Sequence, residues 1–291
     1  MSEKLLKLGI PAGSLQKATL ELFNKAGFNA SDSSRSYYPH IDDDEIKAVC
    51  LRAQEMGRYV YDGVLDAGIT GYDWIRENEC DVVEVCELAY SKATSNPARW
   101  VLCVPEESKV TKPEDLAGGL IATELVKVTE AYFQEKGVDV KVEFSWGATE
   151  VKARLVDAIV ELTETGRSLR ANNLRILDTL ITSTTRLVAN KQAWEDPFKR
   201  EKIENLAILL TAAIEARTKV GLKMNIQREN LEAVLKVLPA EKSPTVSNLV
   251  DSDYVAVEVI LDEKVERNLV PSLKRAGATG IIVYPLNKVI H

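Results

Sequence analysis

The chain has 291 residues, which is enough for two or three domains with properly buried cores. Its apolar share of 45% and charged share of 28% are typical of a soluble globular protein. The net charge of −7 argues against non-specific nucleic-acid binding, because neutralising phosphates requires a surplus of Lys and Arg. No apolar run is long enough to cross a bilayer, and the N-terminal segment is too short in its apolar part for a signal peptide. We therefore expect a cytoplasmic protein with neither a nucleic-acid nor a membrane partner.

Histidine and cysteine are scarce, and this limits the chemistry that the chain can perform. Only His40 and His291 are present, which nearly excludes a Ser-His-Asp nucleophile and leaves too few ligands for a histidine-based metal site. No Cys-x-x-Cys pair occurs, so buried thiols are expected rather than a disulfide or zinc framework. Any reaction must rest on carboxylates, hydroxyls, backbone amides and cations.

The first ninety residues alternate short apolar strands with amphipathic helices. Strands are predicted at 5–11, 48–52 and 63–69. A helical repeat of apolar residues begins at Leu15, and Gly27 follows it as a C-terminal cap. Such alternation predicts a parallel-rich α/β sheet, with ligands bound beyond the carboxyl ends of its strands.

A second α/β unit begins near Arg99 and contains a predicted helix at 126–136. Its predicted strands are WVLCVP (100–105), LIATEL (120–125), VKVEFSW (140–146) and DAIVEL (157–162). After RILDTLITSTTRLVAN (175–190), the apolar pattern predicts one long helix, roughly 191–217. Two such units joined by adjacent crossings predict a hinged pair of lobes with a ligand cleft between them.

The remainder of the chain reads as a compact βαββαβ unit. Pro271 is a local misfit in its second predicted helix, 263–276, because an interior proline removes a hydrogen bond. The appended position of this unit is typical of a regulatory module. The predicted domain limits are 1–95 with 188–217 for the first lobe, 96–187 for the second lobe, and 218–291 for the regulatory domain.

The stretch AIVELTETGRSLRANNL (158–174) is the most informative part of the sequence. An apolar strand runs into Glu161, and a hydroxyl-rich loop containing Gly166 then leads into a helix. Glycine can adopt a positive φ, and the unpaired N–H groups of a tight turn and a helix start favour a phosphate monoester. Glu161 would then accept hydrogen bonds from sugar hydroxyls, directly or through Mg²⁺. The alternative is a solvated strand–turn–helix connection, which is commoner for so short a pattern.

The loop resembles the phosphoribosyl-pyrophosphate (PRPP) loop of phosphoribosyltransferases, in which two acids precede a Thr-Gly-x-Thr-Leu turn. Here Val160 occupies the first acid position, and Ser168 stands in place of the second Thr. These departures point to a different scaffold, that of the long-form ATP phosphoribosyltransferase family, which essentially the whole chain resembles. Beyond the loop, the resemblance is carried by RSYYPHIDD (35–43), DGVLDAGITGYDW (62–74), IATE (121–124), FSWGATE (144–150), LVANKQAWEDPFKREKIE (187–204) and SPTVSNL (243–249).

The resemblance implies two α/β lobes like those of periplasmic binding proteins, followed by a ferredoxin-like regulatory domain. It implies a Mg²⁺-dependent transfer that joins N1 of the adenine of ATP to the anomeric carbon of PRPP and releases pyrophosphate. It also implies a homo-oligomer, from dimer to hexamer, that histidine inhibits. These features would make the chain a glycosyltransferase of histidine biosynthesis.

By the same resemblance, Glu124 and Glu161 are the candidate catalytic and metal-binding residues. The alternative for Glu124 is a buried helix-capping role, and Arg167 either meets a phosphate or is solvated beside Glu164. The residues implied to hold the ribose and 5-phosphate of PRPP are Glu161, Thr163, Glu164, Thr165, Gly166, Arg167, Ser168 and Leu169.

The ATP site is expected on the first lobe, with Gly13, Ser14, Arg35, Gly71, Tyr72 and Asp73 as its candidate residues. The alternative for Tyr72 is a half-buried packing role. Many family members carry Lys-Gly-Arg-Leu after the first strand, whereas this chain reads Ala-Gly-Ser-Leu (12–15) and lacks both cations. Either other cations such as Arg35 and Arg52 replace them, or nucleotide binding is weaker at this edge.

The candidates for binding histidine between subunits are Ser243, Thr245, Ser247, Ala278 and Thr279, and ordinary turn chemistry is their alternative role. Two rival functions stay open. One is a two-lobed solute-binding or ligand-sensing protein without turnover. The other is a conventional base phosphoribosyltransferase, against which Val160 at the first acid position argues.

Overall fold

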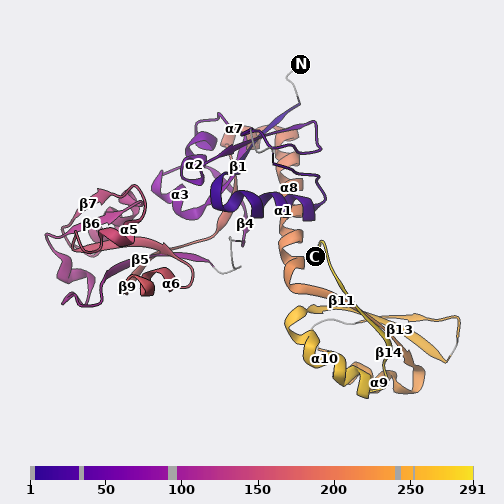
Figure 1. Cartoon of the computed structure of the whole chain (residues 1–291). Coiled ribbons are helices and arrows are strands. Elements are labelled where there is room, and N and C mark those ends of the chain that lie inside the picture. The colour runs from indigo at the N-terminus through magenta and orange to yellow at the C-terminus, as the bar shows by residue number, and fades with distance from the viewer. Residues whose placement is uncertain (1–3, 33–35, 91–96, 240–243, 252, 291) are drawn as a thin grey trace. The chain divides into compact units, whose positions relative to one another are not determined.

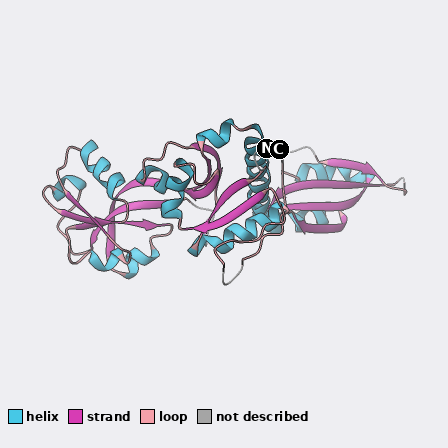
Figure 2. Cartoon of the chain, turned by 90° about the horizontal axis from the view of Figure 1, so that it is seen from above, coloured by secondary structure: helices cyan, strands magenta, loops and turns pink. Residues whose placement is uncertain are grey.

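The residues that the structure describes form three β-sheets with helices packed on their faces (Figure 2). It divides into two compact units, residues 1–208 and 209–291, and the boundary falls inside a long helix. The computed structural model describes residues 4–32, 36–90, 97–239, 244–251 and 253–290.

The first unit contains two five-stranded sheets, and we name the parts built on them the first lobe and the second lobe. In the first lobe, β1, β2 and β3 are parallel, and β10 runs antiparallel to both of its neighbours. The α/β class is thus confirmed, with mixed rather than purely parallel sheets. In spatial order the strands of the first lobe are β2 (Ile46–Leu51), β1 (Leu6–Pro11), β3 (Ala67–Gly71), β10 (Thr185–Ala189) and β4 (Val83–Leu88).

Helix packing explains why β1 and β3 carry glycines at their centres. A Cβ atom on Gly9 or Gly68 would overlap the side chain of Met56, so both glycines let helix α2 lie directly on the sheet. Helix α1 ends at Gly27, whose φ of 104° is the left-handed cap that the sequence predicted. The helices of the first lobe are η1 (Gly13–Leu15), α1 (Gln16–Ala26), α2 (Ala53–Tyr61), α3 (Tyr72–Glu77) and α7 (Lys191–Glu195).

The second lobe repeats this arrangement. Strand β6 is parallel to both neighbours, while β5 runs antiparallel to β8 and β9. In spatial order its strands are β7 (Lys141–Phe144), β6 (Leu120–Thr123), β8 (Ala158–Thr163), β5 (Ala98–Pro105) and β9 (Leu174–Ser183). Its helices are η2 (Pro113–Leu116), α4 (Val126–Glu135), α5 (Thr149–Lys152) and α6 (Arg167–Ala171).

The single long helix predicted at 191–217 is wrong, because the chain forms α7 and then α8 (Pro197–Glu215). Asp196 interrupts them with an extended ψ of 117°. Its carboxylate accepts hydrogen bonds from the N–H groups of Phe198 and Lys199, at 2.9 and 3.1 Å. Pro197 is favourable at the first position of the second helix, where its missing N–H is not needed. The Asp-Pro pair therefore ends one helix and begins another.

The second unit has the predicted βαββαβ order (Figure 1), with η3 (Ala216–Thr218) before it and η4 (Arg228–Asn230) inside it. Its four antiparallel strands lie in the order β12-β13-β11-β14, as in a ferredoxin-like sheet. The elements are β11 (Lys219–Gln227), α9 (Leu231–Val237), β12 (Thr245–Asn248), β13 (Tyr254–Asp262), α10 (Glu263–Arg275) and β14 (Thr279–Pro285).

Helix α10 continues through Pro271, which lies on its exposed face, where water can satisfy the carbonyl that loses its partner. Leu269 and Leu273 of this helix pack on buried residues of β11 and β13 to form the core of the unit. Among the described residues, no helix has both the length and the apolar character needed to cross a membrane. The domain limits given above stay a prediction, and β10 begins before the predicted return to the first lobe at residue 188.

Candidate functional site

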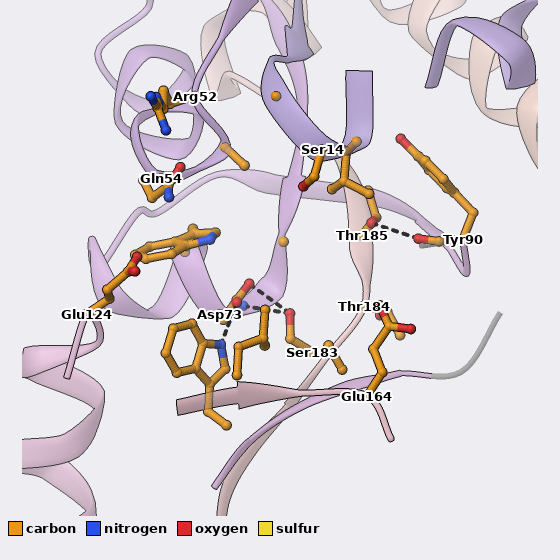
Figure 3. A pocket seen from close by; sticks show the side chains of 18 of the residues that line it. Ser14, Arg52, Gln54, Asp73, Tyr90, Glu124, Glu164, Ser183, Thr184 and Thr185 are labelled. Carbon is orange, nitrogen blue, oxygen red and sulfur yellow. Dashed lines mark hydrogen bonds between the residues drawn. The ribbon is translucent and has the colours of Figure 1, made fainter. Parts of the chain in front are cut away.

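A cavity of about 360 Å³ lies between the two lobes of the first unit. The segments that follow β1, β2 and β3 line it from one side, and those at the ends of β6 and β8 line it from the other. These are carboxyl ends of parallel strands, where open α/β sheets bind their ligands. The lining residues with side-chain polar groups are Ser14, Arg52, Gln54, Asp73, Trp74, Tyr90, Trp100, Glu124, Glu161, Glu164, Ser183, Thr184 and Thr185 (Figure 3).

Glu161 lies near the end of β8 and faces this cavity. Burial raises the pKa of its carboxyl to about 7, and the negative charges of Glu150 and Glu124 add to the rise. Hydrogen bonds from the Leu162 N–H, at 2.9 Å, and from Thr149 act in the opposite direction. The apolar strand thus carries a carboxyl group that is held in a partly dry, acidic environment.

The loop after Glu161 is a tight turn held by its own first hydroxyl. The Gly166 N–H donates to Thr163 Oγ1 at 2.8 Å, and Gly166 adopts the left-handed φ of 69° that the sequence predicted. The Ser168 hydroxyl donates to Glu150 Oε1 at 2.6 Å. Leu169 is buried in the core of the second lobe and anchors the loop.

The structure brings only part of the predicted PRPP loop to the cavity. Glu161 and Glu164 line it, together with Leu162. The remaining predicted residues do not line it: Thr163, Gly166 and Leu169 are buried, whereas Thr165, Arg167 and Ser168 are exposed.

Glu124 approaches the first lobe from the end of β6 (Figure 3). Burial raises the pKa of its carboxyl, while a hydrogen bond with the Gln54 side chain and the charge of Arg52 oppose the rise. Arg52 precedes α2 at the end of β2, and it is the one Arg or Lys side chain among the described residues that line the cavity. The guanidinium of Arg52 and the carboxylates of Glu124, Glu161 and Glu164 therefore line one cavity.

Asp73 lines the cavity, and two side chains of the protein already bind its carboxylate. Its carboxylate is buried and accepts hydrogen bonds from the Trp100 indole N–H at 2.6 Å and from the Ser183 hydroxyl at 2.8 Å. Burial raises the pKa of Asp73, and both hydrogen bonds counteract this. A Cβ atom on Gly71 would overlap the Asp73 carboxylate, so the glycine at this position makes room for it.

The other predicted ATP residues separate into three groups. Gly13 and Ser14 line the cavity, and the φ of 82° at Gly13 lets η1 begin directly after β1. Tyr72 is absent from the cavity lining, and its ring lies under the guanidinium of Arg186, 5.5 Å from the ring centre. Arg35 lies outside the described residues.

The predicted histidine-binding residues fall at the two edges of the sheet in the second unit. Thr245 and Ser247 are exposed on edge strand β12. Ala278 is buried in the core, and Thr279 begins the opposite edge strand, β14. Ser243 lies outside the described residues. The described residues of the set are therefore not brought together within one chain.

Comparison with known proteins agrees with this geometry. Residues 52–212 match the family model described as ATP phosphoribosyltransferase, and residues 216–288 match the model described as HisG, C-terminal domain. The chain belongs to the ATP phosphoribosyltransferase family. It is therefore a glycosyltransferase that acts in the first step of histidine biosynthesis, in the long form that carries the C-terminal domain. This membership sets aside the ligand-binding protein without turnover and the conventional base phosphoribosyltransferase.

Relatives in this family are similar over their full length. The chain is 59% identical to the ATP phosphoribosyltransferase of Chlorobium chlorochromatii (strain CaD3), covering 99% of this chain and 98% of that protein. It is 57% identical to the enzyme of Pelotomaculum thermopropionicum, with 98% and 99% covered. Among solved structures, the ATP phosphoribosyl transferase (HisG:HisZ) complex from Thermotoga maritima matches with a TM-score of 0.62 and 30% identity, covering 72% of this chain and 99% of that one. Tv2483 bound to L-arginine, at 12% identity and a TM-score of 0.50, shares the fold alone, over 73% of this chain and 86% of that one.

Several residues of the site in this family member escaped the sequence analysis. The connection Ser183–Thr184–Thr185 lines the cavity where β9 passes into β10. Trp100 and Gln54 were also missed, because no local pattern marks a residue whose partner lies in the other lobe. Glu150 stood inside FSWGATE, but only its hydrogen bond to Ser168 reveals it. This connection could have been found from the run of four consecutive hydroxyl residues, 182–185, in which it lies.

Proposed function

We propose that the cavity between the two lobes is where the chain joins N1 of the adenine of ATP to the anomeric carbon of PRPP, releasing pyrophosphate. The observation that carries this proposal is that strand ends from both lobes line one cavity. Such an arrangement suits two substrates that are held separately and aligned, and alignment supplies much of the acceleration in such reactions. The displacement passes through a cation-like sugar, so electrostatic stabilisation can replace a covalent nucleophile.

On the PRPP side, Glu161 accepts hydrogen bonds from the ribose hydroxyls, and the loop from Thr163 to Leu169 receives the 5-phosphate. The left-handed turn at Gly166 and the exposed side chains of Thr165 and Ser168 support this assignment. Leu169, with its side chain in the core, contributes through its backbone. The exposed Arg167 supplies a cation near the same phosphate.

Mg²⁺ is the proposed cofactor, and the carboxylates of the cavity fit it. The charge of Glu124 contributes to the raised pKa of Glu161, so a divalent cation beside the two would relieve their repulsion. Carboxylate oxygens are ligands that Mg²⁺ prefers. Among the described residues no group of three or more His, Cys, Asp or Glu side chains is arranged to hold a metal, so the other ligands would be substrate and water oxygens. Bound Mg²⁺ would supply positive charge for the departing pyrophosphate.

On the ATP side, Gly13, Ser14 and Arg52 receive the nucleotide, and Arg35 adds a second cation. Arg52 lies in the cavity lining and can replace one of the two cations that are missing from residues 12–15. Gly71 and Asp73 form the framework of this wall, since the Asp73 carboxylate already has two donors. Tyr72 remains a weaker candidate, because it does not line the cavity.

The second unit is proposed to bind histidine as feedback inhibitor in a homo-oligomer, from dimer to hexamer. Thr245 and Ser247 lie on one edge strand and Thr279 on the other, so a site containing all of them would form between subunits. Ser243 and Ala278 belong to the same proposed site. Removal of the residues after 218 should abolish histidine inhibition, and inhibition that survives the truncation would exclude this role.

The PRPP assignment can be tested by steady-state kinetics that follow the product near the adenine absorbance band. Thr165→Val and Gly166→Ala should raise the KM for PRPP while leaving the KM for ATP nearly unchanged. Thr182→Val, at an exposed position on β9, is the matched control and should change neither constant. An unchanged KM for PRPP in both loop variants would remove the loop from the site.

A further inference from the structure

Glu150 has a contact that the proposed chemistry does not explain. Its Oε1 accepts the only proton of the Ser168 hydroxyl, at 2.6 Å, and Ser168 belongs to the proposed phosphate loop. Glu150 lies on α5, which precedes β8 in the chain. In this arrangement the hydroxyl points its proton at a carboxylate rather than outward to a ligand.

The backbone before Glu150 is bent to reach the loop. Gly147 and Ala148 both have positive φ values, 99° and 49°, and a left-handed conformation is unfavourable for a residue with a Cβ atom such as alanine. The next two residues, Thr149 and Glu150, contact strand β8 and the loop that follows it. Thr149 is buried and hydrogen-bonds with Ser145 and Glu161, and Glu150 bonds to Ser168. The left-handed Ala148 is thus followed directly by two side chains that make polar contacts, one with strand β8 and one with the loop.

A phosphate competes with this arrangement in two ways. Phosphate oxygens are acceptors, so the Ser168 hydroxyl must release Glu150 before it can donate to them. The carboxylate would then stand close to a second negative group, and like charges at such distances repel. Glu150 therefore opposes the attraction that Arg167 and Arg170, whose guanidinium donates to the Thr165 carbonyl at 3.1 Å, offer to an anion at this loop.

We propose that Glu150 determines which phosphate esters the loop accepts, by holding the Ser168 hydroxyl and opposing any phosphate that arrives without a divalent cation. The inference rests on the proposed function of the loop. Ribose 5-phosphate and inorganic phosphate are rejected, whereas PRPP, whose pyrophosphate brings Mg²⁺, is accepted. Specificity of this kind comes from a repulsive element against the wrong ligand as well as from attraction to the right one.

The test is calorimetric titration of the full chain with ribose 5-phosphate in the absence of Mg²⁺. Glu150→Gln keeps the size of the side chain but removes the charge, and its amide oxygen, a weaker acceptor than a carboxylate, releases the Ser168 hydroxyl to the phosphate more readily. It should bind ribose 5-phosphate about fivefold more tightly than the parent chain, the effect of one nearby like charge at the protein surface, and the gain should shrink at high salt. Binding of PRPP with Mg²⁺ should be unchanged or weaker. Glu130→Gln, an exposed glutamate on α4, is the control and should match the parent chain.

Ser168→Ala provides the second measurement. In the parent background, loss of this hydroxyl should change ribose 5-phosphate binding little, because its proton is already engaged by Glu150. In the Glu150→Gln background, the same change should weaken binding several-fold. Ribose 5-phosphate binding that is no tighter in Glu150→Gln overturns the role of Glu150 alone. Binding that neither Ser168→Ala nor Gly166→Ala affects in any background would place the phosphate elsewhere and overturn the proposed function as well.

Discussion

The indole N–H of Trp100 donates to the carboxylate of Asp73 over 2.6 Å, and this hydrogen bond joins the two lobes of the first unit. Trp100 lies on β5 of the second lobe, and Asp73 lies on α3, which follows β3 of the first lobe. Ser183, at the end of β9, donates to the other carboxylate oxygen. The segment through which the chain returns to the first lobe is therefore bonded to the same group. Asp73 therefore connects the two lobes through hydrogen bonds at one wall of the cavity.

Replacing Trp100 with phenylalanine should destabilise the chain by about 1.5–3 kcal/mol, because a buried carboxylate loses a donor to its charged form. The ring remains, so most of the contact with Trp74, 5.9 Å away between ring centres, is kept. Urea unfolding measures the effect. Trp146→Phe is the control, since Trp146 is 92% exposed and its replacement should stay within about 0.5 kcal/mol. Equal effects in the two variants would show that the Trp100 hydrogen bond adds no stability.

Gly71→Ala should disrupt the same contact from the other side. The added Cβ would overlap Asp73 Oδ1 and lie 3.4 Å from Ser183 Oγ, so the carboxylate must move away from its donors. We expect a loss of about 1–3 kcal/mol, the usual cost of overpacking a buried site.

A double-mutant cycle decides whether Asp73 is the cause. In an Asp73→Ala background the carboxylate is gone, so Gly71→Ala should cost much less than in the parent chain. If the two changes are simply additive, the glycine is required for a reason other than room for Asp73. Urea unfolding of the four proteins provides the comparison.

The pKa of Glu161 predicts a pH dependence of stability in the ligand-free chain. Burial raises this pKa from an ordinary value of 4.5 to about 7, so folding favours the protonated form. Its contribution to stability is fully present below pH 4.5 and is lost as the pH rises through 7. The parent chain should therefore lose more stability between pH 5 and 8 than Glu161→Gln does, as measured by thermal unfolding. Identical pH profiles in the two proteins would mean that folding does not raise the pKa of Glu161.

Local patterns predicted those features that depend on local physics. The left-handed cap at Gly27 and the turn at Gly166 follow from the absence of a Cβ atom, and both are found where the sequence predicted them. The βαββαβ order of the second unit follows from apolar alternation and helix stops. The mixed strand directions of both lobes did not follow, because the pairing partner of β10 or β5 is chosen by contacts far along the chain.

The site was predicted less completely for the same reason. Glu161 and Glu124 stand at strand ends and could be found from their position, and both line the cavity. Asp73 was predicted as a ligand contact, yet its hydrogen bonds connect it to Trp100, 27 positions away, and to Ser183, 110 positions away. Such partners leave no mark in the surrounding sequence, so the hydrogen bonds of Asp73 could not be predicted from it.

The break between α7 and α8 yields a prediction about a single side chain. Asp196 Oδ1 accepts hydrogen bonds from the backbone N–H groups of Phe198 and Lys199, at 2.9 and 3.1 Å, and so caps the long helix that runs into the second unit. Asp196→Ala should cost about 0.5–2 kcal/mol, the usual loss of an N-terminal cap, while Asp196→Asn should retain most of it. Glu195→Ala, one position earlier, removes an acid that makes no such cap and is the control. Since Pro197 also favours a helix start, a loss near zero in Asp196→Ala would show that the proline alone fixes the break.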